Sequence, residues 1–234
     1  MDKQKNTATK KSTEPPIWLI GYNLLSGCLW SFALLNVVAT YFAFGMDLHK
    51  TFQLTHWWTT AIQCLALVEI YNAATGVVRS PLLTTTMQVL SRLLVVIGVW
   101  TIVPESPANW SFAYLGVHFA WGITEVIRYY FYASNLMTQQ TPAPGQERHV
   151  VPAPLSWARY NGFVVLYPVG IFCECVMIVG AARWSLAHDG MVYCVFLSVA
   201  LLAYVPGAPV LFSHMLKQRA KRANTQLEKG KKKE

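Results

Sequence analysis

The stretch WARYNGFVVLYPVGIFCECVMIVGAA, residues 157–182, carries only two charged residues, Arg159 and Glu174. A helix needs about 20 mostly apolar residues to cross the roughly 30 Å hydrocarbon core of a bilayer. The stretch meets this requirement. Backbone polar groups in lipid must be hydrogen-bonded within the segment, so we expect it to be a transmembrane helix.

Five further runs of the same kind lie elsewhere in the chain. The six predicted spans cover residues 17–44, 54–78, 83–103, 111–133, 157–182 and 191–212. The sequence therefore predicts an all-α polytopic membrane protein, with six transmembrane helices in one bundle. We assign residues 17–214 to this domain, residues 1–16 to a basic N-terminal tail and residues 215–234 to a basic C-terminal tail.

The composition agrees with a membrane protein. Of the 234 residues 54% are hydrophobic and 13% are charged, about half the usual charged share of a soluble domain. This excludes an ordinary soluble domain and a disordered chain. The five cysteines all lie within apolar runs, which argues against a disulfide framework.

The placement of basic residues predicts the orientation. With six spans both tails lie on one side, and this side collects most of the lysines and arginines, whereas the other side holds only Lys50 and Arg183. By the positive-inside rule we expect both termini to be cytosolic. Basic residues that cap an apolar block fit the anionic surface of a membrane, and they do not suggest nucleic-acid binding.

The last four residues read KKKE. Lysines at the third and fourth positions from a cytosolic C-terminus resemble the dilysine retrieval signal of endoplasmic-reticulum membrane proteins. We therefore expect the protein to reside in that membrane. A solvated basic tail is the plainer alternative.

Polar residues inside the predicted spans are candidates for function, because a charge at the bilayer centre costs at least about 2.5–3.5 kcal/mol. They lie in the second to fifth spans, whereas the first and sixth contain no Asp, Glu, Lys or Arg. We expect spans two to five to surround a polar interior site. The candidates are Glu69, Asn72 and Arg79 on the second span, Gln88 and Arg92 on the third, Glu125 and Arg128 on the fourth, and Arg159, Tyr160, Tyr167, Gly170 and Glu174 on the fifth.

Simpler explanations exist for several of these residues. Glu125 and Arg128 are three residues apart and can form an ion pair that only holds helices together. Arg79 and Arg159 can extend to the cytosolic interface as anchors.

Tyr167 and Glu174 are the most informative pair. They are seven residues apart, so they share one helix face at a separation of about 10.5 Å along the axis. This is too far for a direct hydrogen bond, but it suits two groups that flank a small reacting molecule. Pro168 directly follows Tyr167 and predicts a kink there, and Gly170 leaves room beside it. No basic residue lies within one turn of Glu174. A carboxyl group in an apolar setting suits acid/base chemistry.

Other chemistries find little support. The sequence has no GxGxxG, Walker A or GxSxG motif, which argues against nucleotide-binding loops and α/β-hydrolases. The six histidines show no i, i+4 pairing, which argues against a multi-histidine iron site. We therefore expect neither a metal nor another cofactor.

Four segments together resemble the very-long-chain (3R)-3-hydroxyacyl-CoA dehydratase family, once called protein-tyrosine-phosphatase-like. They read LVEIYNAATGVVRSPLLTTTMQVLSR (67–92), ITEVIRYYFYA (123–133), RYNGFVVLYPVGIFCE (159–174) and PGAPVLFSHMLKQR (206–219). The third segment is the most specific, and the resemblance extends over nearly the whole chain. One departure is Asn72, where the family usually has histidine. Asparagine still forms hydrogen bonds but cannot titrate near neutral pH.

The resemblance implies an enzyme of fatty-acid elongation, a hydro-lyase that removes water from a (3R)-3-hydroxyacyl-CoA to give a trans-2-enoyl-CoA. It places the proposed catalytic pair at Tyr167 and Glu174, without deciding which is acid and which is base. It makes the lipid bilayer and other elongation-cycle enzymes the expected partners.

Further roles are expected around this pair. We expect Arg92, Glu125, Arg128, Gln88, Tyr160 and Gly170 to support or orient the reacting groups, and Arg79 and Arg159 to bind the CoA phosphates. Two other functions stay open: a non-catalytic scaffold of the elongation complex, and a small-solute carrier, since buried charges also mark transport pathways. The lack of an internal repeat argues against the carrier.

Overall fold

The computed structural model describes residues 14–78, 80–142 and 144–231, with side chains described up to residue 224. Regular structure in these ranges is helical throughout. The elements are α1 (Ile17–Ala43), α2 (Leu48–Cys64), α3 (Leu67–Ala74), α4 (Leu82–Leu93), η1 (Leu94–Thr101), η2 (Pro107–Trp110), α5 (Phe112–Met137), α6 (Ala153–Asn161), α7 (Phe163–Ala187) and α8 (Met191–Lys231).

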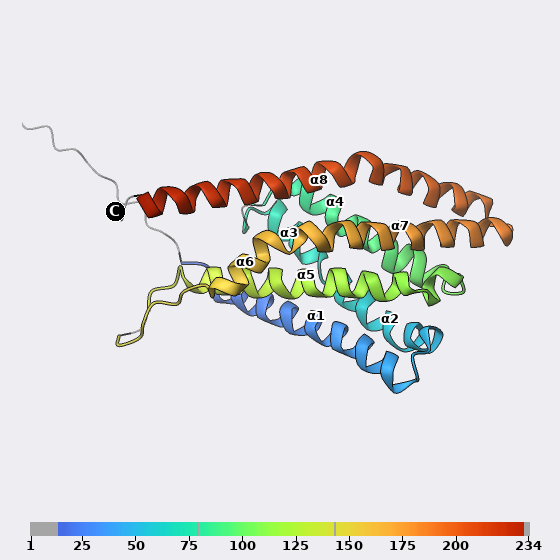
Figure 1. Ribbon diagram of the computed structural model, residues 1–234, viewed down its shortest axis with the longest axis horizontal. Coiled ribbons are helices and arrows are strands. Elements are labelled where there is room, and N and C mark those ends of the chain that lie inside the picture. Colours follow the sequence, from blue (N-terminus) through green and yellow to red (C-terminus); the bar gives the residue numbers. More distant parts are fainter. Residues whose placement is uncertain (1–13, 79, 143, 232–234) are drawn as a thin grey trace, which may run out of the picture.

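The long helices lie side by side in an elongated bundle (Figure 1). Helix α5 packs against α1 on one side and α7 on the other, and α8 runs along α7. The start of α1, the end of α8 and the linker between α5 and α6 lie at one end of the bundle, which we call the terminal end (Figure 1). At this end the backbone N–H of Thr141 donates to the Glu14 carboxylate at 3.2 Å.

Four stretches of described helix are long and apolar enough to cross a membrane: Ile17–Ala43, Leu82–Thr101, Phe163–Ala187 and Met191–Asn224. These overlap four of the six predicted spans and confirm a helical membrane protein. The predicted span 54–78 is divided into α2 and α3 at Leu65 and Ala66, and α5 carries too many polar residues to qualify. A helix enclosed by other helices does not need a lipid-compatible surface all round. Six spans and cytosolic termini stay predictions.

Small residues allow α5 and α7 to approach closely. A Cβ atom placed on Gly116 would lie 2.4 Å from the sulfur of Cys173, and one on Gly170 would lie 3.3 Å from the Cβ of Ala120. Helices in membranes pack through such small residues, because apolar surface alone gives no net attraction in lipid. The close approach brings the polar residues of α5 next to those of α7.

The predicted span 83–103 is helical, but its second half is wider than an α-helix. Element η1 is a π-helix, in which Ile102 N–H donates to the carbonyl of Ile97 five residues earlier, at 3.0 Å. The Tyr193 hydroxyl of α8 donates to the Gly98 carbonyl at 2.6 Å. Helices of this type are rare and often occur at functional sites.

Candidate functional site

Glu174 is a buried carboxylate with two aromatic hydrogen-bond donors. It lies on α7, and its side chain is only 5% exposed. The indole N–H of Trp121 on α5 donates to Oε1 at 2.8 Å, and the hydroxyl of Tyr204 on α8 donates to Oε2 at 2.9 Å. None of the ion pairs among the described residues includes Glu174. Three helices therefore position one carboxyl group without neutralising it.

Tyr167 contacts the same part of α8. Its hydroxyl donates to the carbonyl of Ala208 at 3.0 Å, and its ring stacks on Phe212 with centroids 5.7 Å apart. Ala208 lies one turn after Tyr204, the residue that contacts Glu174. The two candidate catalytic residues thus face one short segment of α8, although neither touches the other through a described hydrogen bond.

Gly170 fills the position between the two candidates. A Cβ atom there would lie 3.8 Å from Oε1 of Glu174 and 3.9 Å from the Trp121 ring. Any larger side chain would enter the space beside the carboxyl group. The space at Gly170 is taken up by Ala120 and Trp121 of α5, and the supporting role expected of Gly170 stays a prediction.

A second cluster, the ion-pair network, connects α3, α4 and α5. Glu125 is 2% exposed and pairs with both Arg92 and Arg128, and Arg128 Nε donates to its Oε2 at 2.8 Å. Arg128 also binds both oxygens of Glu69 at 2.6 Å, and Tyr129 donates to the same carboxylate. Two arginines and two glutamates balance in charge, so desolvation of each ion is offset by its partners.

Arg92 joins the network to the Glu174 site. Its guanidinium lies over the Trp121 ring, 5.2 Å from the centroid. Trp121 is in turn a donor to Glu174. A cation above an aromatic face is attracted by the ring quadrupole. The ion-pair network therefore supports the side chain that supports Glu174.

Of the remaining predicted residues that the structure describes, Gln88, Arg159 and Tyr160 make no described hydrogen bond to Glu174 or Tyr167. Gln88 is exposed on α4, and its supporting role stays a prediction. Arg159 donates to the Tyr132 hydroxyl at 3.0 Å, and Tyr160 packs edge-on against Phe131 and beneath the guanidinium of Arg222. Both lie towards the terminal end, whereas Arg79 and the terminal Lys232, Lys233 and Glu234 fall outside the described residues.

Sequence reasoning missed Trp121 and Tyr204. It excluded the sixth predicted span from the site because that span has no charged residue, but α8 supplies Tyr204 and the carbonyl of Ala208. Two signals were available. Trp121 precedes Glu125 by one helical turn, and Tyr204 stands in an apolar run two residues before Pro206.

Asn72, the departure from the family pattern, is also buried. It is 2% exposed on α3, and its side-chain oxygen has no hydrogen-bond partner among the described residues. It lies one turn after Glu69 of the ion-pair network. Whatever titration a histidine brings to this position, Asn72 contributes none.

The fold and the site thus define a helical membrane protein with a buried acid that is held by aromatic donors. The family described as protein tyrosine phosphatase-like protein, PTPLA, matches residues 63–225. This chain belongs to that family.

Curated relatives agree over most of their length. The chain is 34% identical to the "Probable very-long-chain (3R)-3-hydroxyacyl-CoA dehydratase" of Schizosaccharomyces pombe, covering 86% of this chain and 89% of that protein. It is 31% identical to the very-long-chain (3R)-3-hydroxyacyl-CoA dehydratase hpo-8 of Caenorhabditis elegans, covering 87% and 93%. It is 30% identical to dehydratase 2 of the same name from Homo sapiens, covering 87% and 80%. No solved structure matches the chain.

Proposed function

We propose that this protein removes water from very-long-chain (3R)-3-hydroxyacyl-CoA to give the trans-2-enoyl-CoA, a dehydration step of fatty-acid elongation. The named activity of the relatives supports the reaction. The observation that carries the proposal in this chain is the buried Glu174, held through both oxygens and facing the same segment of α8 as Tyr167.

The reaction needs one base and one acid. The C2–H bond breaks as a base takes the proton, the C3–O bond breaks as an acid protonates the leaving hydroxyl, and a C2=C3 double bond and one water molecule form. A carboxylate and a phenol can share these two tasks. We assign them to Glu174 and Tyr167 as a pair.

The developing negative charge on the thioester oxygen needs hydrogen-bond donors. Arg92 is a candidate for this task, because its guanidinium lies beside Trp121 at the edge of the Glu174 site. Glu125 would then act through Arg92 by fixing its position.

We further propose six spans with both termini cytosolic, in the endoplasmic-reticulum membrane. The shared location of the start of α1, the end of α8 and the α5–α6 linker supports a common side (Figure 1). In this arrangement Arg159 and Arg79 would meet the CoA phosphates at the cytosolic surface. The bilayer and the other elongation-cycle enzymes are the proposed partners.

The test is a dehydration assay on purified Tyr167→Phe and Glu174→Gln variants with a long-chain 3-hydroxyacyl-CoA. Losing one member of an acid/base pair costs about 10²–10⁴-fold in rate. We expect losses of this size while the variants elute and unfold in detergent like the unaltered protein.

Two matched controls carry the same chemical changes at exposed positions: Tyr71→Phe, where the tyrosine is 67% exposed, and Glu105→Gln in the loop after η1. Both should keep full turnover. Full turnover by both site variants contradicts the assignment of the pair. An inactive unaltered protein that moves solutes across vesicles contradicts the enzyme and favours a carrier.

A further inference from the structure

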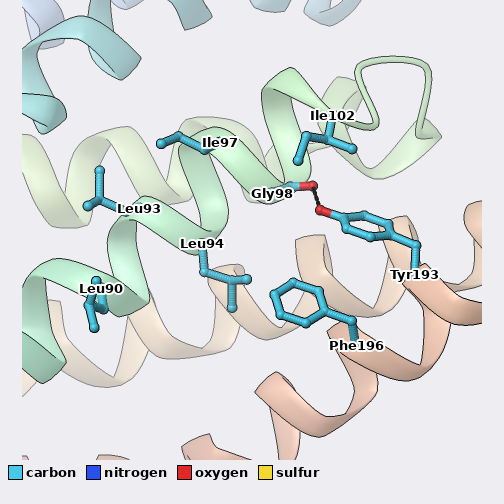
Figure 2. Close-up of a pocket in the computed structure, with 8 residues that line it drawn as sticks. All are labelled: Leu90, Leu93, Leu94, Ile97, Gly98, Ile102, Tyr193 and Phe196. Atoms are coloured by element: carbon cyan, nitrogen blue, oxygen red, sulfur yellow. Dashed lines mark hydrogen bonds between the residues drawn. The ribbon is translucent and has the colours of Figure 1, made fainter.

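An apolar groove runs along the outer face of the bundle between the α4–η1 segment and α8. It has a volume of about 470 Å³, within the 300–1,000 Å³ that is usual for ligand sites. Figure 2 shows its lining, which consists of Leu90, Leu93, Leu94, Ile97, Gly98, Ile102, Tyr193 and Phe196.

Two tyrosines of α8 contact the α4–η1 segment at the two ends of the groove. At the far end the Tyr193 hydroxyl donates to the Gly98 carbonyl at 2.6 Å (Figure 2). At the near end the Tyr204 hydroxyl lies 3.4 Å from the carbonyl of Ser91, the residue that follows Leu90. The tyrosines are eleven residues apart, which is three helical turns and about 16 Å of α8.

The near end lies beside the candidate catalytic site. The Tyr204 hydroxyl that approaches Ser91 is also the donor to Oε2 of Glu174. The reacting carbons of a 3-hydroxyacyl chain must lie beside Glu174, and the rest of the chain must leave from there. The groove begins one residue from the contact that Tyr204 makes with α4.

The far end is shaped by the π-helix. A Cβ atom on Gly98 would lie 3.2 Å from the Tyr193 hydroxyl and 3.3 Å from Leu94, so the wall admits no side chain at this position without displacement. The Tyr193–Gly98 contact therefore narrows the groove at a fixed distance from Tyr204, and Ile102, one turn after Gly98, continues the lining past it. A narrowing at a fixed distance can distinguish acyl tails that end before it from tails that extend past it.

We infer that this groove binds the acyl tail of the substrate and that the narrowing at Tyr193 and Gly98, past which a very long tail extends, influences the preferred chain length. The inference rests on the proposed dehydratase function. The ligand chemistry is a saturated hydrocarbon chain that continues from a 3-hydroxyacyl thioester. Because the lining residues Leu90, Ile102 and Phe196 are exposed on the surface of the bundle, a long tail can enter from the bilayer without crossing water.

The first test uses the unaltered protein. A long-chain 3-hydroxyacyl-CoA with a diazirine at the tail end is bound in detergent and irradiated, and the labelled peptides are identified by mass spectrometry. We expect labels in the segments 90–102 and 193–196 that disappear with excess unlabelled substrate. Labels elsewhere overturn the inference, and labels that excess substrate does not displace identify a site for membrane lipid instead.

The second test changes the lining at two partly exposed positions. Ile97→Trp fills the groove, and Phe196→Ala widens it. The controls are Val195→Trp and Val195→Ala, because Val195 is 57% exposed and does not line the groove. The readout is kcat/KM across a series of acyl lengths. A single methylene contact is worth about tenfold or more in such ratios.

We expect Ile97→Trp to lower kcat/KM by about tenfold or more for the longest tails and little for the shortest. Phe196→Ala should shift the preference towards longer tails, and both Val195 variants should keep the original profile. An unchanged profile, an equal loss at every length or the same shift in the Val195 variants overturns the inference. Activity on short tails in all variants keeps the proposed reaction separate from this result, whereas the absence of activity at every length in the unaltered protein refutes the reaction itself.

Discussion

Tyr204→Phe tests whether the aromatic donors position Glu174 for the reaction. The change removes the 2.9 Å hydrogen bond to Oε2 and leaves the 2.8 Å bond from Trp121 to Oε1. The carboxyl group then keeps its place on α7 but loses one of the two contacts that fix its rotation.

The change also removes the longer 3.4 Å contact with the Ser91 carbonyl, but the size of the effect on turnover follows from the lost bond to Glu174. A hydrogen bond to a carboxyl group contributes about 1–3 kcal/mol, which corresponds to about a 5- to 150-fold fall in turnover if it is needed only in the transition state. Because phenylalanine has the same aromatic ring as tyrosine, the packing between α7 and α8 is kept. We expect kcat to fall by this factor while KM changes little.

The assay measures initial rates over a range of substrate concentrations, together with the unfolding midpoint in detergent. Trp121→Phe removes the other donor and should give a comparable fall in kcat. Tyr71→Phe is the matched control. If Tyr204→Phe and Trp121→Phe both keep the original kcat, or if kcat falls only in proportion to lost folded protein, the donors do not position Glu174.

The remaining predictions concern stability. Glu125→Ala removes the buried carboxylate that two partly buried arginines share. It should lower the free energy of unfolding by about 3–5 kcal/mol, measured by thermal unfolding in detergent, whereas Glu105→Ala should change it little. Equal midpoints contradict a structural role for the ion-pair network. Gly116→Ala drives a Cβ atom to 2.4 Å from the sulfur of Cys173 and should cost about 1–3 kcal/mol. Gly21→Ala in α1, where a Cβ atom meets nothing within 4 Å, should instead stabilise by up to about 1 kcal/mol; the same sign for both glycine variants refutes the packing argument.

The sequence predicted the helical membrane class and part of the site. Apolar runs of sufficient length indicated helices, and the spacing of Glu125 and Arg128 indicated their ion pair, which the structure contains. Tyr167 and Glu174 were placed on one helix, which α7 confirms. These features depend on local spacing along one segment, which a single sequence records directly.

The rest depends on contacts between segments. Trp121 and Tyr204 are ordinary residues of apolar helices until α5, α7 and α8 bring them against Glu174. The π-helical turns of η1 are equally hidden, because a uniformly apolar run such as LVVIGVW at 94–100 shows no period. The break between α2 and α3 at Leu65 and Ala66 contains no glycine or proline, so the sequence gives no sign of it.

The ion-pair network has a consequence for how the bundle assembles during synthesis. Glu69 on α3 and Arg92 on α4 are synthesised before α5, which brings both Glu125 and Arg128. Until α5 arrives, the emerging chain carries an acid and a base whose final partners have not yet been made. Helix α5 is therefore required before the charges of α3 and α4 can be paired. A nascent chain that stalls before residue 125 should be degraded by membrane quality control and should not persist as a stable half-bundle.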